Sequence, residues 1–561
     1  MSQNAHTNLI INGLAADSFS VSGFTGTDEI SVPYCFTIHL ISQKNDITVD
    51  SAVGQGATLY ILRDNNYIPY SGVVSSFSFI EKTVDFCRYR LELVPRLWML
   101  SLNIRSKVYQ QITPLETVEQ VLKDAGLSSY YKISCNKTYN KEDFILQYNE
   151  TDLNFIRRLM QDAGIWFFFE EKSVNATNWD KIGKESLVIT DDPTSFGDIE
   201  QPNQLNYRSR SGLNQTIDKE EKESIHTIGF EKQMVSANIK LKNYTYRTPE
   251  VALDAIKPVD GGKNGEINDF GGKGRDVDSL MSIARIRANQ LATSHSAVIG
   301  KGICRGFKAG YKFSLIDVPH PDISDKLFIQ KVTHEGKQST NADVIENKGD
   351  FSYHNRFVAI AIKRLKNFMP GHELIYPKIH GVVSAKIESI GGDYAHIDDK
   401  GRYKIRLPFD TADAANAEAS KYVRLSQAYS GANYGIHFPS HEGTEMLIGY
   451  INGDPDKPVG LGTVPNANTI SPVTSKNKHQ SVIRTAGNNQ IILDDMDQKQ
   501  KIQINTNAKH LMTFDDENKV IVIKTTDDNK VVLDDKNKLV TINAAENLIS
   551  ISYGDDGNKI N

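Results

Sequence analysis

The C-terminal part of the sequence repeats a short pattern, and this repeat constrains the fold more than any other feature. Each unit holds one run of β-forming apolar residues and one polar turn, with a period of roughly eight to eleven residues. A unit of this size cannot bury its apolar face alone, so neighbouring units must stack. A single chain would still expose apolar surface and open strand edges, and we therefore expect three chains to wind together. The apolar runs lie within residues 490–495, 501–505, 510–516, 519–523, 530–535, 538–542 and 547–551.

Pairs of aspartates recur after these runs, as in Asp494-Asp495 and Asp534-Asp535. One interpretation makes them calcium ligands, because carboxylate oxygens suit that ion. The glycine-rich GGxGxD spacing of calcium-binding repeats is missing from the segment. We therefore favour solvated turns that keep the strand edges from aggregating.

Upstream, short β-rich runs separated by Gly, Asp, Asn and Pro have the spacing of a barrel or sandwich. The period then becomes helical. Thr113 and Pro114 are typical of a helix start, with Gly126 as the stop. A second helix is predicted from Thr151 or the next residue to Gly164. The fold class expected is mainly β with some α (α+β), with early strands at 9–11, 34–40, 57–62, 77–80 and 89–94.

Two segments invite a ligand-binding interpretation that we do not favour. The aromatic run at 165–169 suggests a cofactor box or a lipid anchor, but it is short and two glutamates follow it, which indicates a buried core strand. Residues 254–276 are rich in Gly, Asp, Lys and Asn. They lack the GxxxxGK[ST] order of a phosphate loop, and no apolar strand leads into them. We expect a flexible surface loop there, followed by a helix over 277–291.

Composition excludes several classes of protein. The chain has 561 residues, with 64 Lys+Arg against 69 Asp+Glu, and this near balance argues against a nucleic-acid-coating protein or a polybasic membrane binder. No apolar stretch reaches the length of a transmembrane helix, and no signal peptide is visible, so we expect a soluble protein made in the cytoplasm. The four cysteines, expected to be reduced and buried rather than paired or catalytic, are Cys35, Cys87, Cys135 and Cys304.

The sequence contains no clear catalytic or metal-binding motif. His437, His441 and Glu445 have the spacing of helical metal ligands, but Pro439 and Gly443 lie between them and the order differs from HExxH. No GxSxG nucleophile motif occurs. We predict no catalytic residue, no metal and no cofactor, and therefore no enzyme; a cell-wall hydrolase hidden in the N-terminal part is the least favoured alternative.

Several motifs resemble those of one family. Residues 147–160 and 164–168 are similar to the "Y-x-E-T/S-D-x-x-F-x-x-R-L…G-I-x-Y-x-F" pattern of VgrG proteins, the spike proteins of type VI secretion systems. The sharpest similarity is "D-x-x-G-R-x-K-V…G-x-E-V-L-V…G-D-P-D-x-P", which residues 398–407, 443–448 and 452–458 resemble. Further matching stretches lie at 95–100, 108–110, 310–313, 320–321, 332–334, 353–357, 381–385, 422–425 and 435–439.

Departures from the family pattern are few. Tyr422 stands where the family often has Trp, and Ser440, His441 and Glu442 replace a frequent Arg-Ile-Gly. Both look like packing changes. The C-terminal repeats lack the Val-x-Gly octad of the family's phage relatives, so the geometry of each repeat unit is left open.

The resemblance implies a domain plan. Residues 1–369 are expected to form a base like a phage baseplate hub, with paired β-barrels and helical parts. Residues 370–466 are expected to form an OB-fold spike domain, 467–487 a linker and 488–561 the needle, a trimeric β-helix or prism.

The resemblance also implies a working assembly. It is a homotrimer that contacts a hexameric tube protein, baseplate proteins, non-covalently bound effectors and a PAAR-type tip protein, with transient contact to a target membrane and none to nucleic acid. Export would be by contraction after assembly in the cytoplasm. The spike of an extracellular contractile injection particle or phage tail is the alternative. The residues expected to meet the tip protein are Ile549, Ile551, Tyr553 and Ile560.

Overall fold

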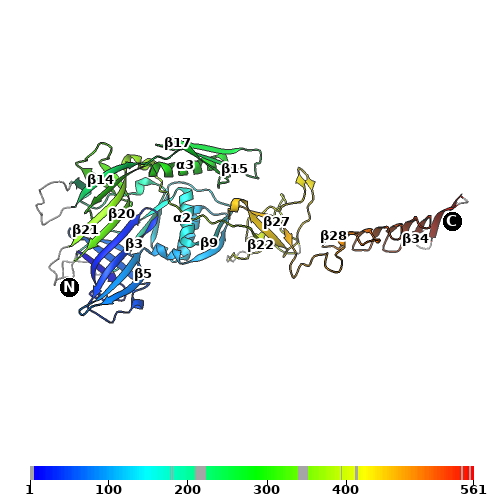
Figure 1. Cartoon of the computed structure of the whole chain (residues 1–561), viewed down its shortest axis with the longest axis horizontal. Helices are drawn as coiled ribbons and strands as arrows, with labels where there is room; N and C mark the ends of the chain where they lie inside the picture. Colours follow the sequence, from blue (N-terminus) through cyan, green and yellow to red (C-terminus); the bar gives the residue numbers. More distant parts are fainter. Residues whose placement is uncertain are drawn as a thin grey trace. The chain divides into compact units, whose positions relative to one another are not determined.

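The computed structural model describes residues 6–176, 179, 181–208, 223–338, 351–392, 394–410, 415–544, 547–554 and 557–560. The chain forms two compact units (Figure 1), one of residues 1–428 with 448–461 and the other of residues 429–447 with 462–561. The fold is mainly β with a smaller share of helix, as predicted.

A first barrel forms around aromatic and aliphatic side chains such as Phe36 and Leu91, which are fully buried. The strand Cys87–Val94 alternates buried with more exposed residues because successive side chains point to opposite faces, whereas Gly56–Arg63 and Asn66–Lys82 have continuous buried runs. The Gln338 side chain bridges the two end strands: it accepts a hydrogen bond from Thr7 N at 2.9 Å and donates to Val21 O at 3.2 Å. The hydrogen-bonded order is β1 (Thr7–Ile11), β4 (Gly56–Arg63), β5 (Asn66–Lys82), β6 (Cys87–Val94), β3 (Val32–Ser42) and β2 (Ser20–Glu29).

A second barrel continues the same sheet, because β2 pairs with β20. Its ring closes through an additional pairing of β20 with β21. Phe307, Phe313 and Phe357 pack against one another in its core. Of the paired barrels expected from the resemblance, this ring is closed by strand pairing, whereas in the first group the end strands β1 and β2 are joined through the Gln338 side chain. The strand order is β20 (Lys326–Lys337), β19 (Lys312–Ile316), β13 (Gln204–Tyr207), β14 (Ser224–Lys232), β18 (Ser296–Gly302) and β21 (Ser352–Ala361).

The predicted helices are confirmed with their caps. Thr113 and Glu116 form a capping box at the start of the first helix. Thr151 accepts from Asn154 N at the start of the second, and Gly164 ends it with a φ of 69°. The helices are α1 (Pro114–Asp124), α2 (Asp152–Ala163) and α3 (Val277–Ser294). Smaller strands around them are β7 (Ile104–Tyr109), β8 (Tyr131–Ser134), β9 (Ile145–Thr151), β10 (Trp166–Glu170), β11 (Val174–Asn175) and β12 (Ser186–Thr190).

The prediction of a flexible loop over 254–276 was wrong. This segment supplies β16 (Leu253–Pro258) and β17 (Asn264–Phe270), which flank β15 (Ser236–Asn243) in a three-stranded sheet. Leu253 and Ala255 of β16 pack in one cluster with α3 residues such as Leu280. The sequence of the remaining segment resembles that of a loop, because β17 is an exposed edge strand that contains few apolar residues. Its glycines lie in the turns, where Gly261 and Gly271 have φ of 82° and 92°.

The OB-like domain contains a four-stranded sheet in the order β23 (Ile405–Arg406), β22 (Val382–Ile387), β26 (Glu445–Tyr450) and β27 (Pro458–Val464). Residues 422–425 contribute only single bridges, Val423 with Tyr403 and Leu425 with Gly460. A short hairpin of β24 (Ser430–Gly431) and β25 (Tyr434–Gly435) precedes β26.

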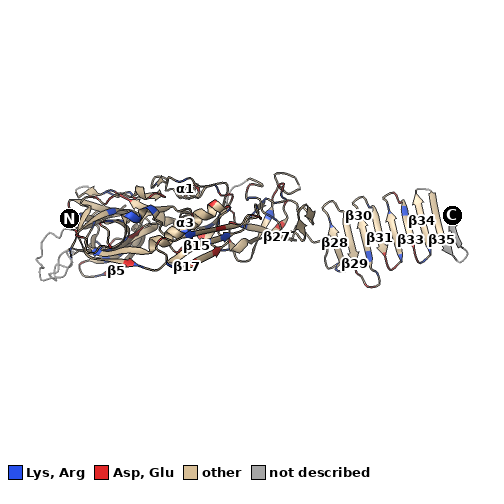
Figure 2. Cartoon of the chain, turned by 90° about the horizontal axis from the view of Figure 1, so that it is seen from above, with Lys and Arg blue, Asp and Glu red and all other residues tan. Residues whose placement is uncertain are grey.

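The C-terminal repeats form one antiparallel sheet in which the strands follow each other in sequence order (Figure 2). Each strand turns straight back on its neighbour, so a single chain forms a meander and not a β-helix. The first strand lies inside residues 467–487, which were predicted to form a linker. It contains only two adjacent apolar residues, and no Asp-Asp turn like that of the later repeats follows them. The strands are β28 (Gln480–Arg484), β29 (Gln490–Asp494), β30 (Lys501–Asn505), β31 (Leu511–Asp515), β32 (Val520–Lys524), β33 (Lys530–Asp534), β34 (Leu539–Ala544), β35 (Asn547–Gly554) and β36 (Gly557–Ile560).

The cysteines are free thiols, and the expectation that they are buried holds for Cys87 and Cys304. Cys135 is half-buried. Cys35 is exposed, because it falls on an outward-facing position of β3 between the buried residues Tyr34 and Phe36.

Candidate functional site

The VgrG-like motif at 147–160 builds a buried ion pair at the start of α2. The Arg158 guanidinium donates from Nε to both carboxylate oxygens of Glu150 at 3.0 Å and from Nη2 to Oε1 at 2.7 Å. The two side chains are only 3% and 5% exposed. Burial by itself would lower the pKa of Arg158, but the hydrogen bonds and charge of Glu150 outweigh it and raise that pKa. The spacing in the motif follows from this geometry. Glu150 lies near the end of a strand (Ile145–Thr151), and Arg158 lies about two turns into α2.

This ion pair positions the backbone that receives the OB-like domain. Arg158 Nη2 also donates to Leu146 O at 3.0 Å. The N–H of Leu146 in turn donates to Asp456 Oδ1 at 2.7 Å, and Asp456 belongs to the second motif, Asp454-Pro455-Asp456. The two motifs, far apart in the sequence, therefore meet at one point within the first unit.

Asp456 is held there as a carboxylate. Lys273 Nζ lies 3.2 Å from Asp456 Oδ2 and 3.4 Å from Asp162 Oδ2. Burial acts to raise the pKa of Asp456, but Lys273, Arg158 and the Leu146 N–H together lower it. We call this set, Arg158, Glu150, Leu146, Lys273 and Asp456, the junction.

Main-chain carbonyls of the glycine-rich segment complete the contact. Lys457 Nζ donates to Gly271 O at 2.6 Å and to Gly272 O at 2.9 Å. On the other side of Asp456, Lys421 Nζ donates to the Asp456 carbonyl at 2.6 Å. Sequence reasoning missed this role of the glycines, and their density was the only available sign of it. The junction can transmit load between hub and OB-like domain through several short polar contacts.

A second candidate surface is the apolar face of the C-terminal sheet. The register places apolar residues of neighbouring strands opposite one another, such as Ile504 with Met512 and Ile521 with Leu533, so two apolar columns run across the strands. Several of these side chains are strongly exposed in the single chain, among them Ile523 at 50%. The face consists of Ile483, Ile491, Leu493, Ile502, Ile504, Met512, Phe514, Ile521, Ile523, Val531, Leu533, Val540, Ile542, Ile549 and Ile551.

The residues predicted to meet a tip protein fall on this same face. Ile549 and Ile551 are 48% and 38% exposed and continue the two apolar columns. The backbones of Tyr553 and Ile560 lie in β35 and β36, and their side chains lie outside the described residues.

The Asp-Asp pairs lie in turns, as the sequence analysis favoured. Asp515 Oδ1 accepts from Asn518 N at 3.0 Å, and its other oxygen lies 2.9 Å from Lys501 Nζ. Asp534 accepts from Asn537 N at 2.8 Å in the equivalent turn. The Asn518 N–H and Lys501 lower the pKa of Asp515 to about 2. In these two pairs the first aspartate therefore stabilises a hairpin turn.

This arrangement predicts an acid-sensitive turn. The folded pKa of Asp515 lies below its ordinary value of 3.8, so its contribution is complete above about pH 4 and is lost as the pH falls toward 2. Asp515→Asn should cost about 0.5–1 kcal/mol at pH 6 and little at pH 2. Amide hydrogen exchange of residues 515–519 at several pH values measures it. Asp516→Asn, which alters the neighbouring carboxylate, is the matched control; equal effects of both variants would contradict the assignment.

In the part of the chain that the structure describes, no three His, Cys, Asp or Glu side chains are arranged to hold a metal ion. His437, His441 and Glu445 do not form such a set. None of the described helices combines the length and apolar character needed to cross a membrane.

Two regions of the chain match known protein families. Residues 27–340 match the family described as phage tail baseplate hub (GPD). The chain belongs to this family. Residues 394–464 match the type VI secretion system/phage-baseplate injector OB domain, the region that supplies Asp456 to the junction. The hub match spans the helices α1, α2 and α3 and most barrel strands, while β1, the start of β2 and β21 lie outside it.

Curated relatives of this hub protein carry VgrG names, which confirms the resemblance. It is 24% identical over 522 residues to the actin cross-linking toxin VgrG1 of Vibrio cholerae, covering 88% of this chain and 45% of that protein. It is 24% identical over 466 residues to the type VI secretion system spike protein VgrG1b of Pseudomonas aeruginosa, covering 82% and 60%. The chain thus spans about half the length of these relatives.

Solved structures share the fold. An E. coli component of the type VI secretion system, described as similar to the T4 bacteriophage tail proteins gp27 and gp5, superposes with a TM-score of 0.58 at 21% identity and covers 81% of this chain and 99% of its own. A chain of the Francisella PdpA–VgrG complex gives a TM-score of 0.61 at 11% identity, covering 92% and 79%.

Proposed function

We propose that this chain is the hub-and-spike subunit of a contractile injection machine of the type VI secretion kind. It works as a homotrimer, without catalysis, and pierces a target membrane when the machine contracts. Membership of the baseplate hub family supports the role of the hub, and the relatives are named spike proteins. In this proposal tube and baseplate proteins contact the hub, and effectors travel non-covalently with the spike.

The observation that carries the proposal is the apolar face of the C-terminal sheet. Two uninterrupted apolar columns exposed to water would promote aggregation of a single chain. Three copies that turn these faces toward a common axis bury both columns at once and form a three-sided prism. Each side chain that becomes buried contributes on the order of 1 kcal/mol, so the needle is stable only when three chains meet.

The same geometry refines the proposed contact with a PAAR-type tip. Ile549 and Ile551 would be occupied by packing between the copies. We therefore assign the tip contact to β36 and the end of β35, the strands that contain Ile560 and Tyr553.

The mass in solution tests this function. At micromolar concentration the full chain should have a particle mass of three times 62.7 kDa, as measured by light scattering. A monomer under these conditions would overturn the proposal. Incubation of the trimer with peptidoglycan is the second arm: release of soluble fragments would show that the chain is an enzyme.

A further inference from the structure

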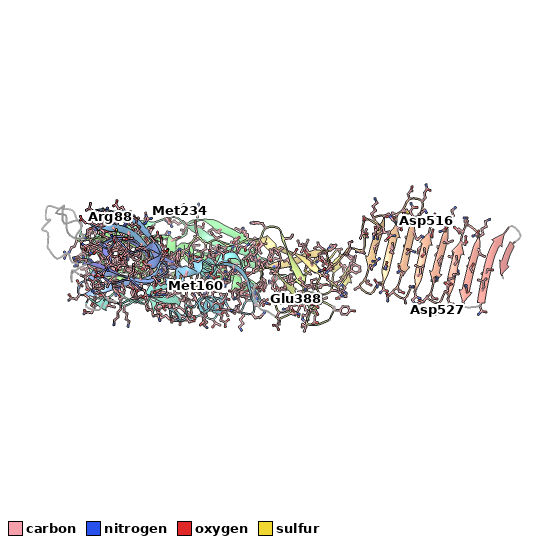
Figure 3. The ribbon with its side chains drawn as sticks, turned by 90° about the horizontal axis from the view of Figure 1, so that it is seen from below. Arg88, Met160, Met234, Glu388, Asp516 and Asp527 are labelled. Atoms are coloured by element: carbon pink, nitrogen blue, oxygen red, sulfur yellow. The ribbon has the colours of Figure 1, made fainter. Side chains whose placement is uncertain are left out.

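The turns of the C-terminal sheet alternate between its two edges, and the two edges differ in charge. Figure 3 labels Asp516 and Asp527, which lie at opposite edges. We define the acidic edge as the turns at 494–501, 515–520 and 534–539, which hold eight carboxylates and five cations. The basic edge comprises the turns at 484–490, 505–511 and 524–530, which hold four cations and two carboxylates.

Part of this charge is already paired within the chain. On the acidic edge Lys501 contacts Asp515 at 2.9 Å, and on the basic edge Lys524 contacts Asp528 at 2.6 Å. Other charges at these turns have no ion-pair partner among the described residues of the same chain. On the acidic edge these are Asp495, Asp497, Asp516, Asp534 and Asp535 against Lys519, Lys536 and Lys538, and on the basic edge they are Arg484, Lys509 and Lys530 against Asp527, so the unpaired charge is net negative on the first edge and net positive on the second.

We propose that the acidic edge of each copy packs against the basic edge of the next copy, so that complementary charge closes the three-sided needle. This inference rests on the proposed trimer and specifies how its corners are made. In a closed ring of three identical sheets, each corner joins one edge of one copy to the opposite edge of its neighbour. Unlike edges therefore meet at every corner.

Strand spacing assigns the partners. Neighbouring strands are about 4.8 Å apart, and turns at the two edges are offset by one strand. The turn of Asp516, between β31 and β32, is then level with a point between the neighbour's turns of Lys509 and Lys530. By the same offset Asp535 lies one strand spacing from Lys530, and Asp495 one spacing from Lys509. Complementary charge at such distances selects one register and disfavours others.

Charge reversal tests the assignment in the full chain. Asp516→Lys with Asp535→Lys should place like charges at every corner and raise the concentration at which the trimer dissociates about tenfold at low salt. Lys509→Glu with Lys530→Glu should act in the same direction. Combining all four substitutions in one chain restores opposite charges and should return the dissociation concentration to near that of the unmodified protein. Analytical ultracentrifugation over a range of concentration and salt measures each variant.

Asp527→Lys is the matched control, because it removes a carboxylate from the basic edge with the same charge change per site as Asp516→Lys. It should leave the trimer unchanged or strengthen it. The effect of charge reversal on the dissociation concentration should shrink above about 0.5 M salt, because the ions screen the interaction between charges over a short distance. Two results would overturn the edge assignment without contradicting the trimer. One is a dissociation concentration that neither double variant changes, and the other is a fourfold variant that dissociates as readily as the double variants. A monomeric unmodified chain would overturn the trimer itself.

Discussion

Replacing Arg158 by methionine is expected to destabilise the hub by about 3–5 kcal/mol, because it leaves the Glu150 carboxylate buried without its partner. Both side chains are almost inaccessible to water, so solvent cannot replace the lost hydrogen bonds. The same change releases the Leu146 carbonyl and so loosens the strand that donates to Asp456. Hydrogen exchange should therefore rise in β9 and at the start of α2.

The double variant Arg158→Met with Glu150→Met isolates the cause. Removing both charges leaves no unpaired ion, and most of the lost stability should return. Arg88→Met is the matched control, since Arg88 pairs with Glu81 on the surface, where the two side chains are 48% and 51% exposed, and its loss should cost less than about 1 kcal/mol. Calorimetry of the full chain measures all three. A single Arg158 variant as mild as Arg88→Met would contradict the importance of the ion pair.

Placing a charge on the apolar face should abolish the trimer. Phe514→Asp sets one carboxylate in each copy at the centre of the face, beside Ile502 and Ile521, and closing the prism would bring three carboxylates into an apolar core. Such burial costs several kcal/mol per ion. The dissociation concentration should rise by at least about a hundredfold, as measured by light scattering, while unfolding of the hub stays unchanged.

Gln503→Asp is the control for this variant. Gln503 lies in β30 between Ile502 and Ile504 and therefore faces the opposite side of the sheet. It should leave the mass of the particle at three chains. Equal loss of the trimer in both variants would mean that the copies do not share the apolar face.

Local patterns in the sequence were sufficient for the elements that carry their own signals. The cap at Thr113, the left-handed stop at Gly164 and the buried run at Trp166–Glu170 follow from interactions within a few residues. Segment 254–276 was mispredicted for the opposite reason. Edge strand β17 is stabilised by pairing with β15, and its own residues give no periodic apolar signal.

The sequence alone determined the family by its motifs and the C-terminal repeat by its alternation, because alternation and motif order are properties of neighbouring residues. Only the tertiary structure decided where those residues act. It brought Asp456 to Leu146, across 310 positions in the sequence, and it aligned apolar residues of successive repeats, such as Ile502, Phe514 and Ile521, on one face of a meander. The reason is physical: hydrogen bonds between distant segments and the register of strands depend on how the chain folds back, which no local pattern encodes.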